Sequence, residues 1–232
     1  MGANPERSLE LTATRRPDVA TLTTPTTMAE LLEQLGDIPP ERVRLRPTPG
    51  TATERDVVKI HNRERRLCEL VDGVLVEKPM AYYKSHLAML IGTFLQNFNE
   101  QHDLGVVTGA DGMMRLAKGL VRIPDVAFVD WDKFPNRTIP RTPIPALVPD
   151  LAVEVLSESN TAREMARKLD EYFDLGVRLV WIVDPETESV EVFASRNQAR
   201  RLDRTGTLDG GDVLPGLKLA LRRLFKKTPR GR

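Results

Sequence analysis

The sequence predicts an α/β fold, more fully an α+β arrangement in which a curved, mixed β-sheet is flanked by helices. Three features predict it. Two short apolar runs flank Asp72-Gly73, a dipeptide typical of the two-residue turn of a β-hairpin. Residues 82–101 carry apolar side chains at the spacing of a helix that packs across a sheet. Apolar runs at 151–156 and 177–183 enclose a helical stretch, so these two strands should be parallel neighbours joined by a right-handed crossover.

Length and composition favour one soluble domain. The chain has 232 residues, of which 41% are hydrophobic and 29% charged, as is typical of soluble globular proteins. No apolar run approaches the ~20 residues of a membrane helix, and the polar stretch 1–27 lacks the apolar core of a secretion signal. Cys68 is the single cysteine, which excludes an internal disulfide and a multi-cysteine zinc site and fits a reducing compartment. We therefore expect a cytoplasmic protein with no membrane association.

We expect three segments along the chain: a flexible tail at 1–25, a folded domain at 26–225 and a basic tail at 226–232. The first segment mixes Thr, Arg and Pro without a periodic apolar pattern. Within the domain, Thr26 or Thr27 should cap a short helix that ends near Leu35. A Pro-rich loop should follow at 37–51, and then a second helix at 53–62.

The remaining elements follow from apolar periodicity and turn residues. The hairpin strands are expected at 66–71 and 74–78, ahead of the long helix. Beyond that helix we expect strands at 106–107, 113–116 and 120–130, a Pro-rich loop at 135–149, the strand at 151–156, a helix from Asn160 or Thr161 to about Leu175, the strand at 177–183, a hairpin at 189–194 and 199–204, a turn-rich stretch at 207–217 and a short amphipathic piece at 219–224.

Two of these strands carry one carboxylate each in an apolar setting. Asp125 begins a strand directly after Pro124, and Glu154 lies in the middle of the strand at 151–156, where a period of two places it on one face with Ala152 and Leu156. Burying an unpaired carboxylate is costly. Two acids, with Lys168 on the following helix, therefore indicate a divalent metal site beside a lysine. Three simpler interpretations stay open: Glu154 as a core acid satisfied by an arginine or backbone amides, Asp125 as a turn acid, and Lys168 as a solvated helix lysine.

Several motifs together resemble a known family. They are Pro124-Asp125, Val153-Glu154-Val155-Leu156-Ser157, the helix start Thr161-Ala162-Arg163-Glu164, Gly176-Val177, Val180-Trp181-Ile182-Val183-Asp184-Pro185, Cys68-Glu69-Leu70-Val71-Asp72-Gly73 and Gly210-Gly211-Asp212-Val213-Leu214-Pro215-Gly216. This combination, spread over about residues 26–225, is similar to the bacterial restriction-endonuclease-like family within the PD-(D/E)xK nuclease superfamily. The resemblance implies a restriction-endonuclease-like core and DNA as the substrate. It also implies a homodimer, because many nucleases of this superfamily pair two sites across a duplex.

The resemblance also implies residue roles. In the superfamily an Asp and a Glu hold Mg²⁺, and a Lys two residues after the Glu helps to activate water. Here Leu156 stands at that position, and Lys168 on the next helix matches a lysine that the family has moved there. Glu69 is implicated as a further acid near the metal, although a simple ion pair of Glu69 with Arg66 or Lys78 stays open.

The expected function is Mg²⁺-dependent endonucleolytic hydrolysis of DNA, with Mn²⁺ as an alternative ion. Mg²⁺ prefers oxygen ligands, which Asp125, Glu154 and the Val155 carbonyl would provide. Lys168 would orient the attacking water and Glu69 would support the site. A catalytically inactive DNA-binding protein on the same fold, linked to mobile DNA or its control, is the first alternative, and the missing lysine at position 156 favours it. A sugar hydrolase with paired carboxylates is the second, which an open aromatic cleft between the acids would favour.

Further candidates surround this set. His86 is expected on a face of the long helix toward the sheet, either hydrogen-bonded or in the site. Tyr172, one helical turn after Lys168, would hydrogen-bond the site or pack in the core. With a net charge of only +1, DNA binding requires a local basic surface. The candidates for phosphate contacts are Arg63, Arg65, Arg66, Arg222, Arg223, Lys226 and Lys227.

Overall fold

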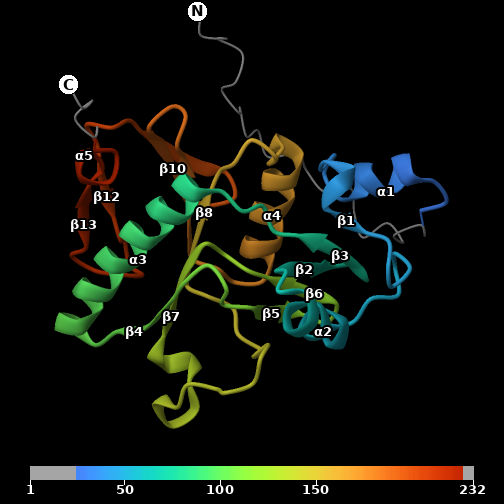
Figure 1. The fold of residues 1–232 in the computed structure, drawn as a ribbon. Coiled ribbons are helices and arrows are strands. Elements are labelled where there is room, and N and C mark those ends of the chain that lie inside the picture. Colours follow the sequence, from blue (N-terminus) through green and yellow to red (C-terminus); the bar gives the residue numbers. More distant parts are fainter. Residues whose placement is uncertain (1–24, 227–232) are drawn as a thin grey trace, which may run out of the picture.

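The computed structural model describes residues 25–226, shown in Figure 1. The chain begins with helix α1 (Met28–Gln34), which the Thr27 side chain caps by accepting a hydrogen bond from the Glu30 N–H at 3.2 Å. A short 3₁₀ turn η1 (Pro40–Arg42) and strand β1 (Val43–Arg44) follow, and helix α2 (Glu54–Glu64) begins with a capping box. Both predicted N-terminal helices are therefore confirmed. The predicted tails at 1–25 and 226–232 lie, apart from residues 25 and 226, outside the described residues.

The strands form two main sheets and a small ribbon, where the sequence predicted one curved sheet. The first sheet has the order β1-β3-β2-β6-β5, and its strands after β1 are β2 (Cys68–Val71), β3 (Val74–Glu77), β5 (Met114–Ala117) and β6 (Leu120–Arg122). The second has the order β11-β10-β9-β8-β7-β4 and consists of β4 (Gly105–Thr108), β7 (Val126–Asp130), β8 (Leu151–Val155), β9 (Leu179–Asp184), β10 (Ser189–Ser195) and β11 (Gln198–Leu202).

The predicted continuous strand at 120–130 is divided between these sheets. Residues 120–122 form β6 of the first sheet, and residues 126–130 form β7 of the second. Pro124 stands between them and has no backbone N–H to donate to a ladder, so the chain leaves one sheet there and enters the other. Asp125 consequently lies at the junction of the two sheets.

Strand pairing around β8 places the acids. β8 runs parallel to β9 with Glu154 opposite Ile182, which confirms the predicted parallel pair. β7 runs antiparallel to β8 with Val126 opposite Val153. Extending this register by one residue puts Asp125 opposite Glu154, and the Asp125 N–H donates to the Val153 carbonyl at 2.9 Å.

Helices cover both faces of the second sheet, as the mixed α/β prediction requires (Figure 1). Helix α3 (Tyr82–His102) packs with Leu87, Ile91 and Leu95 against the face that carries Val153 and Val155. Helix α4 (Ala162–Asp174) packs against the opposite face, the one that carries Ala152 and therefore Glu154.

The C-terminal part of the chain adds strands β10 and β11 at one edge of the second sheet, and then a small ribbon and a short helix. The predicted hairpin is present as β10 and β11, and it is followed by the ribbon of β12 (Thr207–Asp209) and β13 (Lys218–Ala220) and by the one-turn helix α5 (Leu221–Leu224). Figure 1 shows this ribbon and α5 beside α3, far from α2. Among the described residues, no helix combines the length and the apolar character needed to cross a membrane.

Candidate active site

Asp125 is a buried carboxylate with three donors. It is 1% exposed, and the ammonium groups of Lys78 and Lys84 lie 2.9 Å from Oδ1 and 2.6 Å from Oδ2. The Val155 N–H donates to Oδ2 at 2.7 Å, which fixes the side chain toward the end of β8. Burial would raise the pKa of Asp125, but the two ammonium groups outweigh it and hold the pKa below its ordinary value. A turn acid needs neither this burial nor these three donors, so the interpretation of Asp125 as a simple turn acid is not supported.

Glu154 lies on the neighbouring strand, also buried, at 3% exposure. The Tyr172 hydroxyl donates to Oε1 at 2.6 Å, and Lys168 Nζ lies 3.2 Å from Oε1 and 3.3 Å from Oε2. The acid is therefore satisfied by a lysine and a tyrosine of α4, and not by an arginine or backbone amides. Tyr172 is fully buried and combines the two roles considered for it, since its ring packs in the core while its hydroxyl binds Glu154.

Glu69 on β2 belongs to the same cluster. Its carboxylate accepts from Arg122 at 2.7 Å, from the Ile123 N–H at 3.1 Å and from Lys168 at 3.3 Å. The structure thus pairs Glu69 with Arg122 and Lys168, while Arg66 pairs with Glu77 and Lys78 with Asp125. Burial would raise the pKa of Glu69, but Lys168 and Arg122 hold it well below its ordinary value.

Lys168 is not the solvated helix lysine of the simplest interpretation. It is 3% exposed, and its ammonium lies between Glu69 of the first sheet and Glu154 of the second. Burial would lower the pKa of Lys168, but the two carboxylates reverse this and raise it. Lys168 thus remains an ammonium group, which can donate hydrogen bonds.

Four members of the cluster were missed from the sequence: Lys78, Lys84, Arg122 and Glu171. A signal existed for three of them. Lys84 lies three residues before Leu87, on the apolar stripe of α3, and Glu171 lies three residues after Lys168, on the inner face of α4. Arg122 stands between apolar neighbours in a buried strand, where an unpaired charge would be costly.

The eight buried members of the cluster balance one another's charge, and Arg167 at its edge links Glu171 to Asp72. These eight groups are all at most 7% exposed and form ion pairs with one another. The acids are Glu69, Asp125, Glu154 and Glu171, and the bases are Lys78, Lys84, Arg122 and Lys168. Within residues 25–226, no three His, Cys, Asp or Glu side chains converge as a metal-binding group.

The donor set nevertheless suits a hard divalent cation. It comprises the carboxylates of Asp125 and Glu154, from opposing register positions, and the Val155 carbonyl, and all of these donors are oxygens, which Mg²⁺ prefers. Lys84 Nζ, 2.6 Å from Asp125 Oδ2 and 2.7 Å from the Val155 oxygen, is a stand-in cation for two of the three donors. The residues therefore fit a divalent ion that would take the place of this ammonium.

The remaining candidates lie away from the cluster. His86 is exposed and stacks on Tyr83 at 6.2 Å between ring centroids, so the prediction that it faces the sheet is wrong. The basic residues proposed for phosphate contacts do not form one surface, because α2 and α5 lie on different sides of the molecule (Figure 1). Arg63, Arg65 and Arg66 are exposed near the end of α2, Arg222 and Arg223 on α5, and Lys226 just after it, while Lys227 lies outside the described residues.

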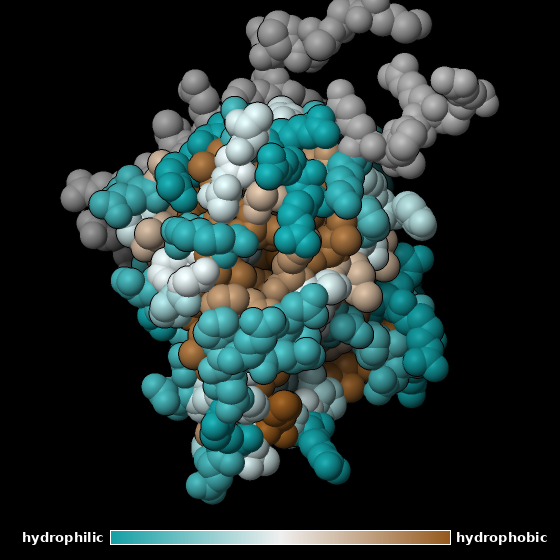
Figure 2. Space-filling view, turned by 90° about the vertical axis from the view of Figure 1, so that its left-hand side faces the viewer, coloured by the Kyte–Doolittle hydropathy of each residue, from teal (hydrophilic) through white to brown (hydrophobic). Residues whose placement is uncertain are grey.

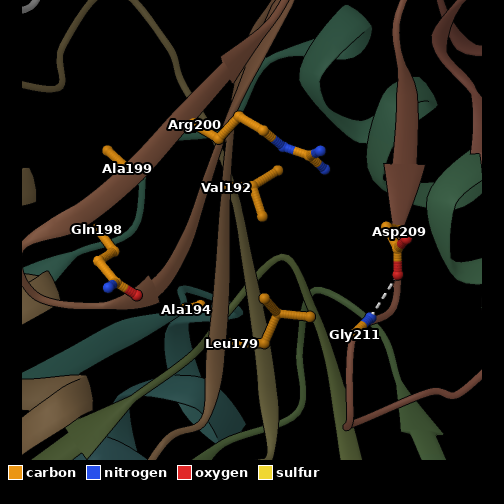
Figure 3. A pocket seen from close by; sticks show the side chains of 8 residues that line it. All are labelled: Leu179, Val192, Ala194, Gln198, Ala199, Arg200, Asp209 and Gly211. Atoms are coloured by element: carbon orange, nitrogen blue, oxygen red, sulfur yellow. Dashed lines mark hydrogen bonds between the residues drawn. The ribbon is translucent and has the colours of Figure 1, made fainter.

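A hollow elsewhere on the surface contains none of these residues. It has a volume of about 310 Å³ and lies between β9, β10, β11 and the end of β12 (Figure 3). Leu179 and Val192 line it, Arg200 extends over it, and Asp209 accepts a hydrogen bond from the Gly211 N–H at 2.8 Å at its edge. Asp125 and Glu154, in contrast, are buried and do not line this hollow, so it gives no support to the sugar-hydrolase alternative.

The fold and the buried acid–lysine cluster define a protein of the restriction-endonuclease-like class. A structural comparison agrees with this class: a crystal structure described as "a putative nuclease belonging to DUF820 from Anabaena variabilis ATCC 29413" superimposes with a TM-score of 0.62 at 17% sequence identity. The match covers 69% of this chain and 90% of that one, and at this identity it shows a shared fold.

The family follows from the sequence comparison. A family model described as "Uma2: Putative restriction endonuclease" matches residues 56–222. The chain therefore belongs to the Uma2 family, and the resemblance noted from the sequence motifs is confirmed. No curated protein matches the chain significantly.

Proposed function

We propose that this protein is a Mg²⁺-dependent endonuclease that hydrolyses DNA phosphodiester bonds. The observation that carries the proposal is the placement of Asp125 and Glu154 at opposing positions of β7 and β8, with Lys168 beside Glu154. Membership of a family described as "Putative restriction endonuclease" supports the reaction class.

In this proposal Asp125, Glu154 and the Val155 carbonyl hold the ion, with Mn²⁺ able to replace Mg²⁺. The bound ion would supply charge neutralisation at the scissile phosphate and a lower pKa for a coordinated water. The protein's own contribution is orientation. The Val155 N–H holds the Asp125 carboxylate, and the Tyr172 hydroxyl holds Glu154, so that both acids are fixed before any ligand arrives.

Lys168 acts as a hydrogen-bond donor in this site. Its ammonium would orient the attacking water or stabilise the negative charge that develops on the phosphorane. Glu69 supports it, because its carboxylate is a second partner of the Lys168 ammonium, at 3.3 Å, beside Glu154 at 3.2 Å. This arrangement assigns to Lys168 the role that the superfamily gives to the residue at position 156, where this chain has Leu156.

We further propose that the protein acts in the cytoplasm as a homodimer. The free, buried thiol of Cys68 suits a reducing compartment. Tyr82 and Met89 on α3 are 93% and 72% exposed. As a separate observation, Figure 2 shows apolar surface gathered on one side of the molecule, framed by hydrophilic residues. Exposed apolar area of this kind favours a contact with a second copy.

A catalytically inactive DNA-binding protein is the second candidate. The observation that favours it is the closed network: each of the two predicted metal-binding carboxylates is buried and already paired with ammonium groups. This candidate predicts DNA binding without turnover in any divalent metal.

Near-isosteric substitutions test the proposal. Asp125→Asn and Glu154→Gln should each abolish Mg²⁺-dependent nicking of plasmid DNA and weaken Mn²⁺ binding in calorimetry. Asp150→Asn is the matched control, because Asp150 is equally buried but lies at the opposite end of β8, paired with Lys133. Cleavage by Glu154→Gln at the wild-type rate in a clean preparation would refute the site, and DNA binding without cleavage in wild type would select the second candidate.

A further inference from the structure

A single ammonium group occupies the place where two of the predicted metal ligands meet. Lys84 Nζ lies 2.6 Å from Asp125 Oδ2 and donates to the Val155 carbonyl at 2.7 Å. Both are short, charge-assisted contacts in a buried setting, since Lys84 is 7% exposed and Asp125 is 1% exposed. A divalent ion bound to the same two oxygens would have to take the position of this ammonium.

We propose that Lys84 is the resident cation of the metal position, and that a divalent ion binds there only as the Lys84 side chain withdraws. This inference rests on the metal site of the proposed function. It adds that competition with the Lys84 side chain sets the affinity of that site for the ion. Lys84 is then a residue that regulates occupancy of the site.

Charge balance makes the withdrawal necessary. The four buried carboxylates and four buried basic groups of the cluster cancel, and at its edge Arg167 links Glu171 to Asp72, which adds one charge of each sign. A divalent ion added to this set would leave two uncompensated positive charges in a poorly solvated site, which is strongly unfavourable. Removal of one ammonium reduces the excess and at the same time frees two oxygen donors.

Lys84 is the lysine best placed to leave. Lys78 also contacts Asp125, but its ammonium donates in addition to the carbonyls of Ile123 at 2.6 Å and Ala110 at 3.1 Å, which hold it in place. Lys84 lies in the first turn of α3, where its neighbours Tyr83 and Ser85 are exposed. Its flexible four-carbon stem therefore has a short path to solvent.

Calorimetric titration of Mn²⁺ into the full-length protein tests the inference. Lys84→Met keeps an apolar stem of similar length, and Asp125 retains Lys78 and the Val155 N–H as partners. We expect this variant to bind Mn²⁺ about tenfold more tightly than wild type, or better, because loss of one charge-assisted hydrogen bond is enough for that change. Lys78→Met is the matched control, since it removes the same charge from the same carboxylate but leaves Lys84 on the Val155 carbonyl, and it should give a clearly smaller gain.

The outcomes separate this inference from the proposed function. Equal Mn²⁺ affinity in wild type and Lys84→Met, or an equal gain in Lys78→Met, overturns the role of Lys84. The proposed nuclease then still stands if Asp125→Asn weakens Mn²⁺ binding and abolishes cleavage. Mn²⁺ binding by Lys84→Met alone supports the inference and refutes a metal-dependent nuclease in the natural chain. Absence of binding in every variant refutes both.

A second measurement on wild type covers the case in which Lys84→Met does not fold. Buried, hydrogen-bonded lysine ammonium groups give observable ¹H–¹⁵N signals because their protons exchange slowly with water. Addition of Mg²⁺ should remove the signal of Lys84 selectively and retain those of Lys78 and Lys168. Retention of all three signals at saturating Mg²⁺ overturns the inference.

Discussion

The hydrogen bond from Tyr172 to Glu154 offers a clean test of how the buried acids are held. Tyr172→Phe removes one hydroxyl group and keeps the ring, which is fully buried against the inner face of the sheet. At 2.6 Å this is the shortest contact of Glu154, because the two distances to the Lys168 ammonium are 3.2 and 3.3 Å. Burial and Glu154 hold the pKa of Tyr172 well above its ordinary value, so the phenol remains a donor at any working pH.

The expected loss can be estimated from the bond type. A hydrogen bond to a charged group contributes about 1.5–3 kcal/mol to the free energy of unfolding, and the short distance and full burial favour the upper half of that range. For a domain of this size such a loss lowers the melting temperature by about 5–12 °C. Urea unfolding followed by tryptophan fluorescence, to which the buried Trp181 contributes, measures the free energy directly.

Tyr82→Phe is the matched control for this experiment. Tyr82 is 93% exposed, so removal of its hydroxyl should change the free energy of unfolding by less than about 0.5 kcal/mol. A change of the same small size in Tyr172→Phe would refute the reasoning, because it would show that the Glu154 carboxylate does not depend on the hydroxyl.

Two further predictions concern groups outside the proposed metal position. Burial, with a smaller effect of Glu77, raises the pKa of the Cys68 thiol to about 12, so a thiol reagent at about pH 8 should label it only in denaturant; rapid labelling of the folded protein would contradict its burial. Burial would raise the pKa of Glu164, but its ion pair with Arg42 at 2.7 Å outweighs this and lowers it from 4.5. Glu164 therefore adds stability that is complete above the unfolded-state pKa and is lost as the pH falls through the lower folded-state pKa. Glu164→Gln should thus flatten the dependence of unfolding free energy on pH below about pH 5, and parallel curves for the two proteins would contradict this.

Local sequence signals predicted the elements that carry the site. The apolar run interrupted only by Glu154 indicated a buried strand with its acid on a core face, and the Asp72-Gly73 turn indicated the hairpin that carries Glu69. Both were confirmed, because the strand period and the turn geometry are set by neighbours in sequence. The prediction that His86 faces the sheet was wrong because the buried stripe of α3 follows Leu87 and Ile91, about 100° around the helix from His86.

The partners of the acids depend on contacts between distant segments. Glu69 pairs with Arg122, which is 53 residues away in sequence, and Asp125 Oδ2 pairs with Lys84 from a different helix. No periodicity within a strand or a helix reports such distances. The division of the strands into two sheets at Pro124 also depends on contacts between distant segments. The proline indicated a break in the strand, but it did not indicate which strands would pair with the residues before and after it.

The ion pairs of the candidate site also join the parts of the fold. Lys78, at the end of β3, holds Asp125 at the start of β7, and Lys168 of α4 lies between Glu69 on β2 and Glu154 on β8. The Lys78–Asp125 contact joins the first sheet to the second, and Lys168 joins α4 to both sheets. Removal of one charge therefore weakens the junction as well as any chemistry performed there, and leaves its partner buried and unpaired. Loss of activity on alanine substitution at these positions would not distinguish a catalytic role from a role in stability. Neutral substitutions of similar shape can assign a role to each residue, provided that unfolding is measured together with cleavage and metal binding.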